Sequence, residues 1–242
     1  MGSYRNVNRR RAGVLVSLPS IVSEHSFECG DIYSLYPLCD WAKDIGFSII
    51  QLLPLNDTGF GYSPYSAISA FAIDPLYISL YKLNLNIRSR KREIRFLENH
   101  PLRIRNLKLE AIRKYYTVYA SERSNERSLL LFGRVYACYS YAAFRLLYEE
   151  FEGKGWWEWP KEYQNPNGAK EYIFTKRREE ALFWVYLQKI AYDQLSEVKL
   201  HFEDVGVYLK GDMPILTSRN SCDVWEHPVV FYYGSASGCP SR

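Results

Sequence analysis

The chain of 242 residues lacks several features, and each absence narrows the classes of protein to which it can belong. No run of about 18 apolar residues occurs, so the sequence predicts no transmembrane helix. The first residues include arginines but no apolar segment of signal-peptide length, so we expect no signal peptide. Neither an internal repeat nor a low-complexity tract is present. Together these absences favour a globular, cytoplasmic protein with no membrane partner.

Metal-ligand motifs and a large excess of one charge are missing as well. The five cysteines, at positions 29, 39, 138, 222 and 239, are scattered and form no CxxC motif, as is typical of reduced cytoplasmic thiols. The four histidines show no ligand spacing, so we expect no bound metal. The net charge of +4, from 31 basic and 27 acidic residues, is too small to indicate a nucleic-acid partner.

Aromatic residues, in contrast, are abundant. They make up 16% of the chain, with 21 tyrosines and 6 tryptophans. One interpretation is a core and surface rich in tyrosine. The other is a carbohydrate-binding protein, because the C–H faces of sugar rings pack against aromatic rings. Composition leaves both interpretations open.

The first third of the chain predicts a βαβ unit. Residues 14–18 form a short apolar run typical of a strand, and residues 32–45 carry a helical stripe, with Asp31 as N-cap and Gly46 as C-cap. Residues 47–55 are nearly all apolar, as in a strand buried on both faces of a parallel sheet. The loop at 56–69, rich in Gly, Ser, Pro and Tyr, follows at the edge where α/β proteins bind ligands.

The middle of the chain predicts helices. Residues 87–114 are strongly basic, which indicates a solvated helical face or, as a weaker alternative, a nucleic-acid-binding patch interrupted by glutamates. Residues 129–151 and 179–202 carry further helical patterns. The cluster of Trp156, Trp157 and Trp159 favours core packing over a sugar-binding platform.

A third strand is predicted at 205–212, and the chain divides into three parts. Residues 1–86 hold the first βαβ units, residues 87–200 form a helical inserted subdomain, and residues 201–242 hold the third strand with its loop. A closed (β/α)8 barrel needs eight strands in about 250 residues. We therefore predict an α/β fold, a partial (β/α)8 TIM barrel with a large, mainly helical insertion.

Three segments resemble the 4-alpha-glucanotransferases of the amylomaltase (disproportionating enzyme) type. The first is GVLVSLPS at 13–20. The second joins QLLPL at 51–55, SPYS at 63–66, SAFA at 69–72 and DPL at 74–76, and it is the most specific. The third joins GDMPI at 211–215 and NSCDVW at 220–225. Ile50 and Asp74 replace the family's usual Trp and Asn. The match is to the N-terminal half of the family and covers most of the chain outside the helical insertion.

The resemblance implies transfer of α-1,4-glucan segments between maltooligosaccharides with retention, and no metal or redox cofactor. This chemistry uses two carboxyl groups about 5 Å apart, a nucleophile and an acid/base. The family's nucleophile lies in an R-x-D motif, which does not occur in this chain. The resemblance therefore places both catalytic carboxylates beyond residue 242 and implies an inactive, truncated fragment.

The resemblance also supplies the candidate substrate-binding residues. Tyr65 matches the tyrosine that packs against the sugar beside the cleaved bond, and Ser63 either bonds a sugar hydroxyl or caps a turn. Asp212 matches an aspartate that orders the polar network of the active site. Asp223 and Trp225 match the family's DVW segment, where the tryptophan lines the glucan groove or anchors the core.

Asp57 lies at the end of the second predicted strand and Asp212 at the end of the third, so the two could be mistaken for a catalytic pair. We interpret Asp57 as a turn residue instead. The expected partners are α-1,4-glucans and a complementing C-terminal fragment. Two other functions stay open: a glucan-binding module without catalysis, and a basic helical module that binds nucleic acid or protein.

Overall fold

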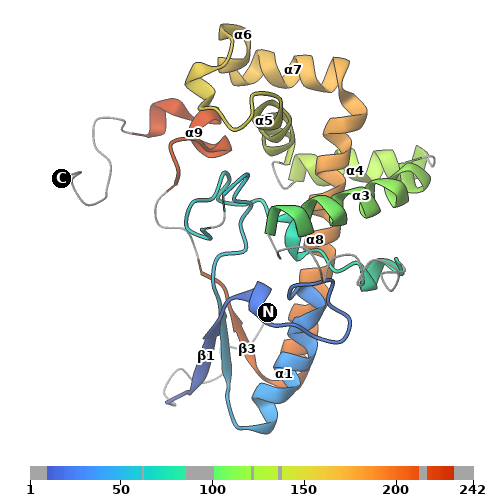
Figure 1. Ribbon diagram of the computed structural model, residues 1–242, viewed down its shortest axis with the longest axis vertical. Helices are drawn as coiled ribbons and strands as arrows, with labels where there is room; N and C mark the ends of the chain where they lie inside the picture. Colours follow the sequence, from blue (N-terminus) through green and yellow to red (C-terminus); the bar gives the residue numbers. More distant parts are fainter. Residues whose placement is uncertain are drawn as a thin grey trace, which may run out of the picture.

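Three short strands form one parallel sheet at one end of the molecule (Figure 1). They are β1 (Gly13–Val16), β2 (Ile49–Leu52) and β3 (Tyr208–Lys210), in the spatial order β1-β2-β3. Val14 lies opposite Ile50, which lies opposite Leu209. The three predicted strands are therefore confirmed, although each is shorter than the apolar run that predicted it.

The computed structural model describes residues 10–61, 63–85, 101–120, 123–135, 138–212 and 217–231. The first half of the basic stretch, up to residue 100, and the C-terminal tail lie outside these ranges.

The predicted helix between β1 and β2 begins with a tighter turn than expected. A 3-10 turn, η2 (Ile32–Ser34), leads into α1 (Leu35–Asp44). Asp31 caps the turn, because its Oδ1 accepts the Tyr33 N–H at 3.0 Å. Gly46, with φ of 85°, ends the helix in a left-handed conformation that favours glycine.

Two helices cover one face of the sheet and leave its other face open. α1 and the 28-residue α8 (Arg178–Val205) pack against each other, and α8 runs from the insertion down to the sheet (Figure 1). Ile50 and Leu52 of the central strand are fully buried. On the opposite face Leu15 and Tyr208 are 55% and 46% exposed. The described residues thus bury one side of the sheet only.

Mainly helical elements lie between β2 and β3 and pack above the sheet (Figure 1). The 3-10 turns and helices described in this part of the chain, which we call the insertion, are η3 (Pro75–Tyr77), η4 (Tyr81–Leu83), α3 (Pro101–Ala120), α4 (Arg123–Val135), α5 (Cys138–Glu150), η5 (Trp156–Glu158), α6 (Lys161–Gln164), α7 (Pro166–Lys176) and α8. After β3 come α9 (Cys222–Glu226) and η6 (Pro228–Val230), and η1 (Leu18–Ser20) follows β1.

The helical pattern at 129–151 is two helices rather than one. α5 folds back on α4, so that the Tyr139 hydroxyl donates to the Leu130 carbonyl at 2.6 Å. The Tyr139 ring lies where a side chain on Gly133 would be, 2.4 Å from an added Cβ. A glycine at this position therefore allows the two helices to approach closely.

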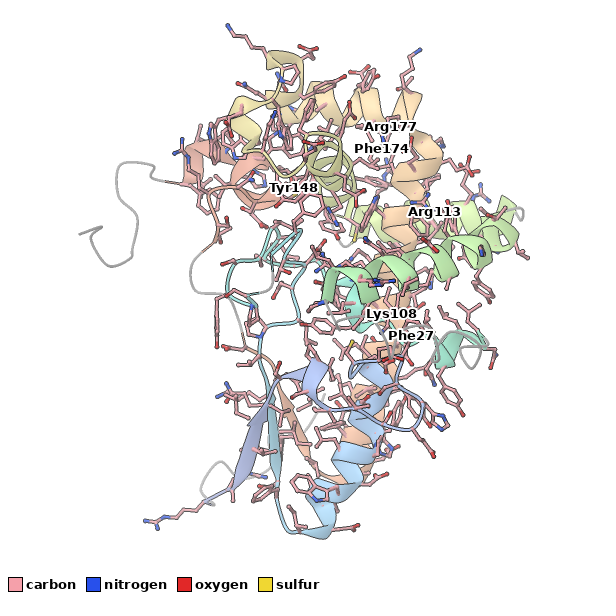
Figure 2. All side chains as sticks on the ribbon, in the orientation of Figure 1. Phe27, Lys108, Arg113, Tyr148, Phe174 and Arg177 are labelled. Carbon is pink, nitrogen blue, oxygen red and sulfur yellow. The ribbon has the colours of Figure 1, made fainter. Side chains whose placement is uncertain are left out.

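Two basic residues of the predicted solvated face are in fact buried. Arg105 and Lys108 of α3 are 2% and 0% exposed. Lys108 donates to the carbonyls of Leu76 and Ile78 at 2.7 and 3.0 Å and lies 3.7 Å from Asp31. Figure 2 shows Lys108 on α3, at the side of the helix that faces the sheet-bearing part. The prediction of a solvated face is wrong at these two positions, because both cations meet buried acceptors.

The tryptophan cluster packs as predicted at two of its three positions, Trp159 and the partly buried Trp156. Trp159 is 2% exposed and lies against Phe144 and Trp225. Trp157, in contrast, is 37% exposed, with the Arg219 guanidinium 4.2 Å above its ring.

The four cysteines that the structure describes are free thiols. No helix within the described ranges has the length and hydropathy needed to cross a membrane.

Candidate functional site

A closed loop follows β2 at the carboxyl edge of the sheet, and we call residues 57–74 the Tyr65 loop. Its two ends are joined by backbone hydrogen bonds, from Asp57 N to Ala72 O at 2.9 Å and from Asp74 N to Leu55 O at 2.9 Å. A third backbone hydrogen bond, from Ile68 N to Asp57 O at 2.8 Å, also joins the outgoing and returning segments near the base of the loop. We call this joined base the neck of the loop. Because the strands are parallel, this loop and the segment after β3 leave the sheet at the same edge.

The tip of the loop presents an aromatic ring to solvent. Tyr65 is 57% exposed, and the turn that carries it is closed by a bond from Ser66 N to Ser63 O at 2.9 Å. Ser63 is also exposed. Its backbone therefore shapes the turn, and its side chain lies at the surface beside Tyr65.

The base of the loop holds a fully buried carboxylate, Asp57. Its Oδ1 accepts the Gly59 N–H at 2.9 Å, which confirms the predicted turn. Its Oδ2 accepts the Tyr141 hydroxyl at 2.6 Å and lies 3.1 Å from Arg145 Nε, both residues on α5. Burial by itself would raise the pKa of Asp57, but Arg145, then Arg105, and the Tyr141 hydrogen bond outweigh it and lower that pKa. Asp57 is therefore an ionised buried anchor as well as a turn residue.

A second buried ion pair closes the other end of the loop. Arg105 Nη2 lies 2.5 Å from Asp74 Oδ2 and 3.3 Å from Thr58 Oγ1. Arg105 Nη1 donates to the Gly59 carbonyl and lies 3.8 Å from Asp57 Oδ1. Burial raises the pKa of Asp74 to about 6, although Arg105 acts in the opposite direction. One guanidinium therefore connects both ends of the Tyr65 loop to α3.

Neither Arg105 nor Arg145 is among the candidate site residues that the sequence predicts. Arg105 belongs to the basic stretch at 87–114, whose pattern is typical of a solvated helical face. Arg145 was detectable, because it interrupts the otherwise apolar run YAAFRLL at 141–147 of a helix. A charged residue on such a face is almost always paired when buried.

Asp57 and Asp212 do not form a catalytic pair in this structure. The Asp57 carboxylate is 0% exposed, and its oxygens are occupied by Gly59, Tyr141 and Arg145. Asp212 follows β3 and is partly exposed. A carboxylate enclosed in this way cannot contact a substrate, whereas the Asp212 side chain is partly open to solvent.

Asp223 fastens α9 to the Tyr65 loop. Its Oδ2 accepts the Ala70 N–H at 2.8 Å, and the neighbouring Cys222 N–H donates to the Ile68 carbonyl at 2.8 Å. Burial raises the pKa of Asp223, whereas the Ala70 N–H acts in the opposite direction. The side chain is half-buried, so it holds the loop and still has some exposed surface.

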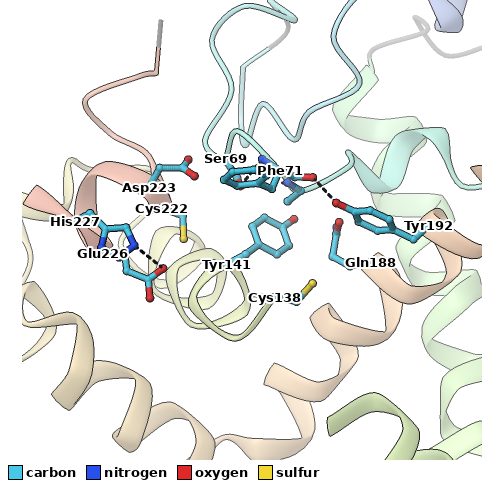
Figure 3. Close-up of a pocket in the computed structure, with 11 residues that line it drawn as sticks. Ser69, Phe71, Cys138, Tyr141, Gln188, Tyr192, Cys222, Asp223, Glu226 and His227 are labelled. Atoms are coloured by element: carbon cyan, nitrogen blue, oxygen red, sulfur yellow. Dashed lines mark hydrogen bonds and ion pairs between the residues drawn. The ribbon is translucent and has the colours of Figure 1, made fainter. Parts of the chain in front are cut away.

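A small pocket lies where the loop meets α5, α8 and α9 (Figure 3). Its volume is about 110 Å³. Its lining comprises Ser69, Phe71, Ala72, Cys138, Tyr141, Gln188, Tyr192, Cys222, Asp223, Glu226 and His227. Ligand pockets typically have roughly 300–1,000 Å³. The pocket is therefore too small for a glucan, and we regard it as a packing gap beneath the loop.

Trp225 lies in the core. It is 0% exposed, its Nε1–H donates to the Tyr163 carbonyl at 3.0 Å, and its ring packs on Phe144 and Trp159. Of the two roles that the sequence left open, the structure matches the core anchor. The groove-lining role would need an exposed ring face, and this ring has none.

Replacing Trp225 by Phe is expected to destabilise the chain by roughly 1–3 kcal/mol, because Phe leaves the Tyr163 carbonyl without its donor and leaves a gap beside Trp159. Urea unfolding followed by circular dichroism measures this loss. A change within ~0.5 kcal/mol of zero would show that the ring does not anchor α9.

Metal-binding side chains approach one another at one place in the described residues. The donor atoms of Cys39, Asp40 and His201 lie within 4.8 Å of one another between α1 and α8, and His201 Nε2 lies 2.9 Å from Asp40 Oδ1. Burial raises the pKa of Cys39 to about 11, so the thiol is protonated at neutral pH. Spacing could not indicate this group, because His201 is 161 residues from Asp40.

The geometry defines an α/β protein with a closed loop that carries an exposed tyrosine at the carboxyl edge of its parallel sheet, where Asp212 follows β3. The family model described as 4-alpha-glucanotransferase matches residues 16–241. A 4-alpha-glucanotransferase of Chlamydia pneumoniae is 35% identical over 240 residues, covering 94% of this chain and 45% of the relative. The rice 4-alpha-glucanotransferase DPE2 is 31% identical over 257 residues, covering 99% of this chain and 27% of the relative.

Solved structures give the same result. The amylomaltase of Streptococcus agalactiae, solved in complex with acarbose, is 26% identical, with a TM-score of 0.77 over 92% of this chain and 47% of its own. The amylomaltase of Corynebacterium glutamicum, at 17% identity and a TM-score of 0.59, shows the same fold. This chain belongs to the 4-alpha-glucanotransferase family. It spans about half the length of the chlamydial relatives it matches.

Proposed function

We propose that this chain supplies the glucan-binding part of a 4-alpha-glucanotransferase, which transfers α-1,4-glucan segments between maltooligosaccharides. The observation that carries the proposal is Tyr65, an exposed ring at the tip of a loop whose base is held by buried ion pairs. An aromatic ring held in this way offers a face for a sugar ring at a small cost in conformational entropy. Ser63, Asp212 and Asp223 are polar groups on the same loop or on the segment after β3 and would bond sugar hydroxyls.

The two catalytic carboxylates would come from residues that this chain does not contain. Retaining transfer needs a nucleophile and an acid/base about 5 Å apart. Asp57 is enclosed by its partners, which leaves Asp212 without a second carboxylate from that loop. The chain also lacks the R-x-D motif, and it covers 45% of the chlamydial relatives.

The open face of the sheet supports a complementing C-terminal half as the partner. Leu15 of β1 and Tyr208 of β3 are exposed there, and both strands are sheet edges among the described elements. A strand at a sheet edge presents unpaired N–H and C=O groups with which a further strand can pair. Additional strands on both edges would extend this sheet toward a (β/α)8 barrel, with α-1,4-glucans bound at its carboxyl edge.

The test is a maltotriose disproportionation assay on residues 1–242, combined with maltoheptaose titration calorimetry. We expect binding without release of glucose or longer products, because the nucleophile is missing. Addition of the C-terminal half of the Chlamydia pneumoniae relative is expected to restore turnover. Glucose release by the chain alone would contradict the location of the carboxylates, and absence of glucan binding would contradict the function.

A binding module without catalysis is the second candidate, and the same observations support it. It predicts maltoheptaose binding and no turnover with any complementing half. The basic helical module for nucleic acid is disfavoured, because Arg105 and Lys108 of the basic stretch are buried against carbonyls and carboxylates.

A further inference from the structure

We infer that Tyr141 and Arg145 of α5 are positioning residues, which act through Asp57 to hold the Tyr65 loop in the conformation that binds glucan. The inference rests on the proposed function and assigns a role in it to the helical insertion. Neither side chain lies at the exposed tip of the loop. Both are buried, at 3% and 2% exposure, and both contact the carboxylate at its base.

The contact between α5 and the loop is strong for three reasons. The Tyr141 hydroxyl donates to a charged acceptor at 2.6 Å, and hydrogen bonds to charged groups are among the stronger ones in proteins. The Arg145 guanidinium lies 4.7 Å over the Trp184 ring of α8 and 3.2 Å from Glu149, so its position is set from several sides. All of this occurs away from water, where charges interact more strongly.

Asp57 transmits this restraint to the loop through its own backbone. Its N–H and C=O close the neck at Ala72 and Ile68, and its Oδ1 orients the Gly59 N–H. Gly59 has φ of 61°, a left-handed conformation, and a side chain there would meet the Tyr148 ring 2.7 Å from its Cβ. The path of the backbone toward Tyr65 is thus set within two residues of the buried carboxylate.

The remaining contacts hold the returning half of the loop and leave the tip exposed. Gln188 of α8 bonds both the N–H and the C=O of Ile73 at 2.9 Å, and the Tyr192 hydroxyl donates to the Phe71 carbonyl at 3.1 Å. Figure 3 shows Tyr141, Gln188 and Tyr192 beneath the loop, on α5 and α8. The insertion therefore holds both sides of the loop, and the outgoing side, which leads to Tyr65, depends on Asp57.

The test compares two Tyr→Phe variants that each remove one buried hydroxyl. Tyr141→Phe loses the bond to Asp57 with little change in volume. Tyr186→Phe is the matched control, since Tyr186 is also 3% exposed but packs on Tyr116 and Tyr119 inside the insertion. The readouts are the maltoheptaose dissociation constant, hydrogen exchange of the amides at residues 58–72, and the melting temperature.

We expect Tyr141→Phe to weaken maltoheptaose binding about ten-fold and to accelerate exchange across residues 58–72. The control is expected to change the melting temperature only. Arg145→Lys, which keeps the charge but not the planar guanidinium, should act in the same direction as Tyr141→Phe.

Two outcomes would overturn the inference. In the first, Tyr141→Phe leaves the exchange rates of the loop as they are in the wild type. In the second, exchange accelerates while the dissociation constant stays unchanged, which would reduce Tyr141 to a structural residue. If the wild-type chain binds no maltoheptaose, the proposed function fails, and the exchange rates alone decide whether Tyr141 holds the loop.

Discussion

Tyr65→Ala is expected to weaken maltoheptaose binding by roughly 30-fold or more, with no change in the free energy of unfolding. The ring is 57% exposed at the tip of its loop, so its removal leaves no cavity in the core. What is lost is the flat face on which a sugar ring would pack. Isothermal titration calorimetry measures the affinity, and urea unfolding measures the stability.

Tyr115→Ala is the matched control for this experiment. Tyr115 is 40% exposed on α3, in the insertion rather than on the loop. The control is expected to bind maltoheptaose with wild-type affinity. If both variants bind equally well, Tyr65 is not the sugar-binding ring, and the glucan-binding function loses the observation that carries it.

Asp57→Ala is expected to lower the free energy of unfolding by about 3–5 kcal/mol, the largest stability effect that we predict. The substitution removes the carboxylate that Arg145 and Tyr141 contact and to which Arg105 is adjacent. Arg145 would then be left buried with only Glu149 as counter-ion, and a buried charge that lacks a partner is costly. Urea unfolding followed by circular dichroism measures the loss.

Asp40→Ala is the matched control for Asp57→Ala, because it removes a carboxylate from an exposed ion pair instead of a buried one. Asp40 contacts His201 at 2.9 Å, but its side chain is 58% exposed. Exposed pairs of this kind contribute at most about 1 kcal/mol. A loss for Asp57→Ala as small as that for Asp40→Ala would mean that the chain relaxes around the missing carboxylate and that the ion pairs do not hold the loop.

The sequence alone determined the order of the elements and the place of the candidate site. Continuous apolar runs predicted β1 and β2 and a helical stripe predicted α1, because a strand of a parallel sheet is apolar on both faces whereas a helix buries one side. The motifs around Tyr65 and Asp212 predicted the family, which the comparisons confirm. The partial barrel and the three-part division of the chain remain predictions.

Only the tertiary structure decided which polar side chains lie inside. Arg105 and Lys108 belong to a basic helical stretch in which sequence periodicity does not distinguish a solvated cation from a buried one, and the apolar run around Arg145 does not reveal its partner. Their partners are far away in the chain. Arg105 lies 31 residues from Asp74, and the Tyr141 hydroxyl donates to Asp57, which is 84 residues away. Charge pairs at such separations form only when the helices pack, because the energy that keeps a charge buried comes from a partner that the local sequence does not contain.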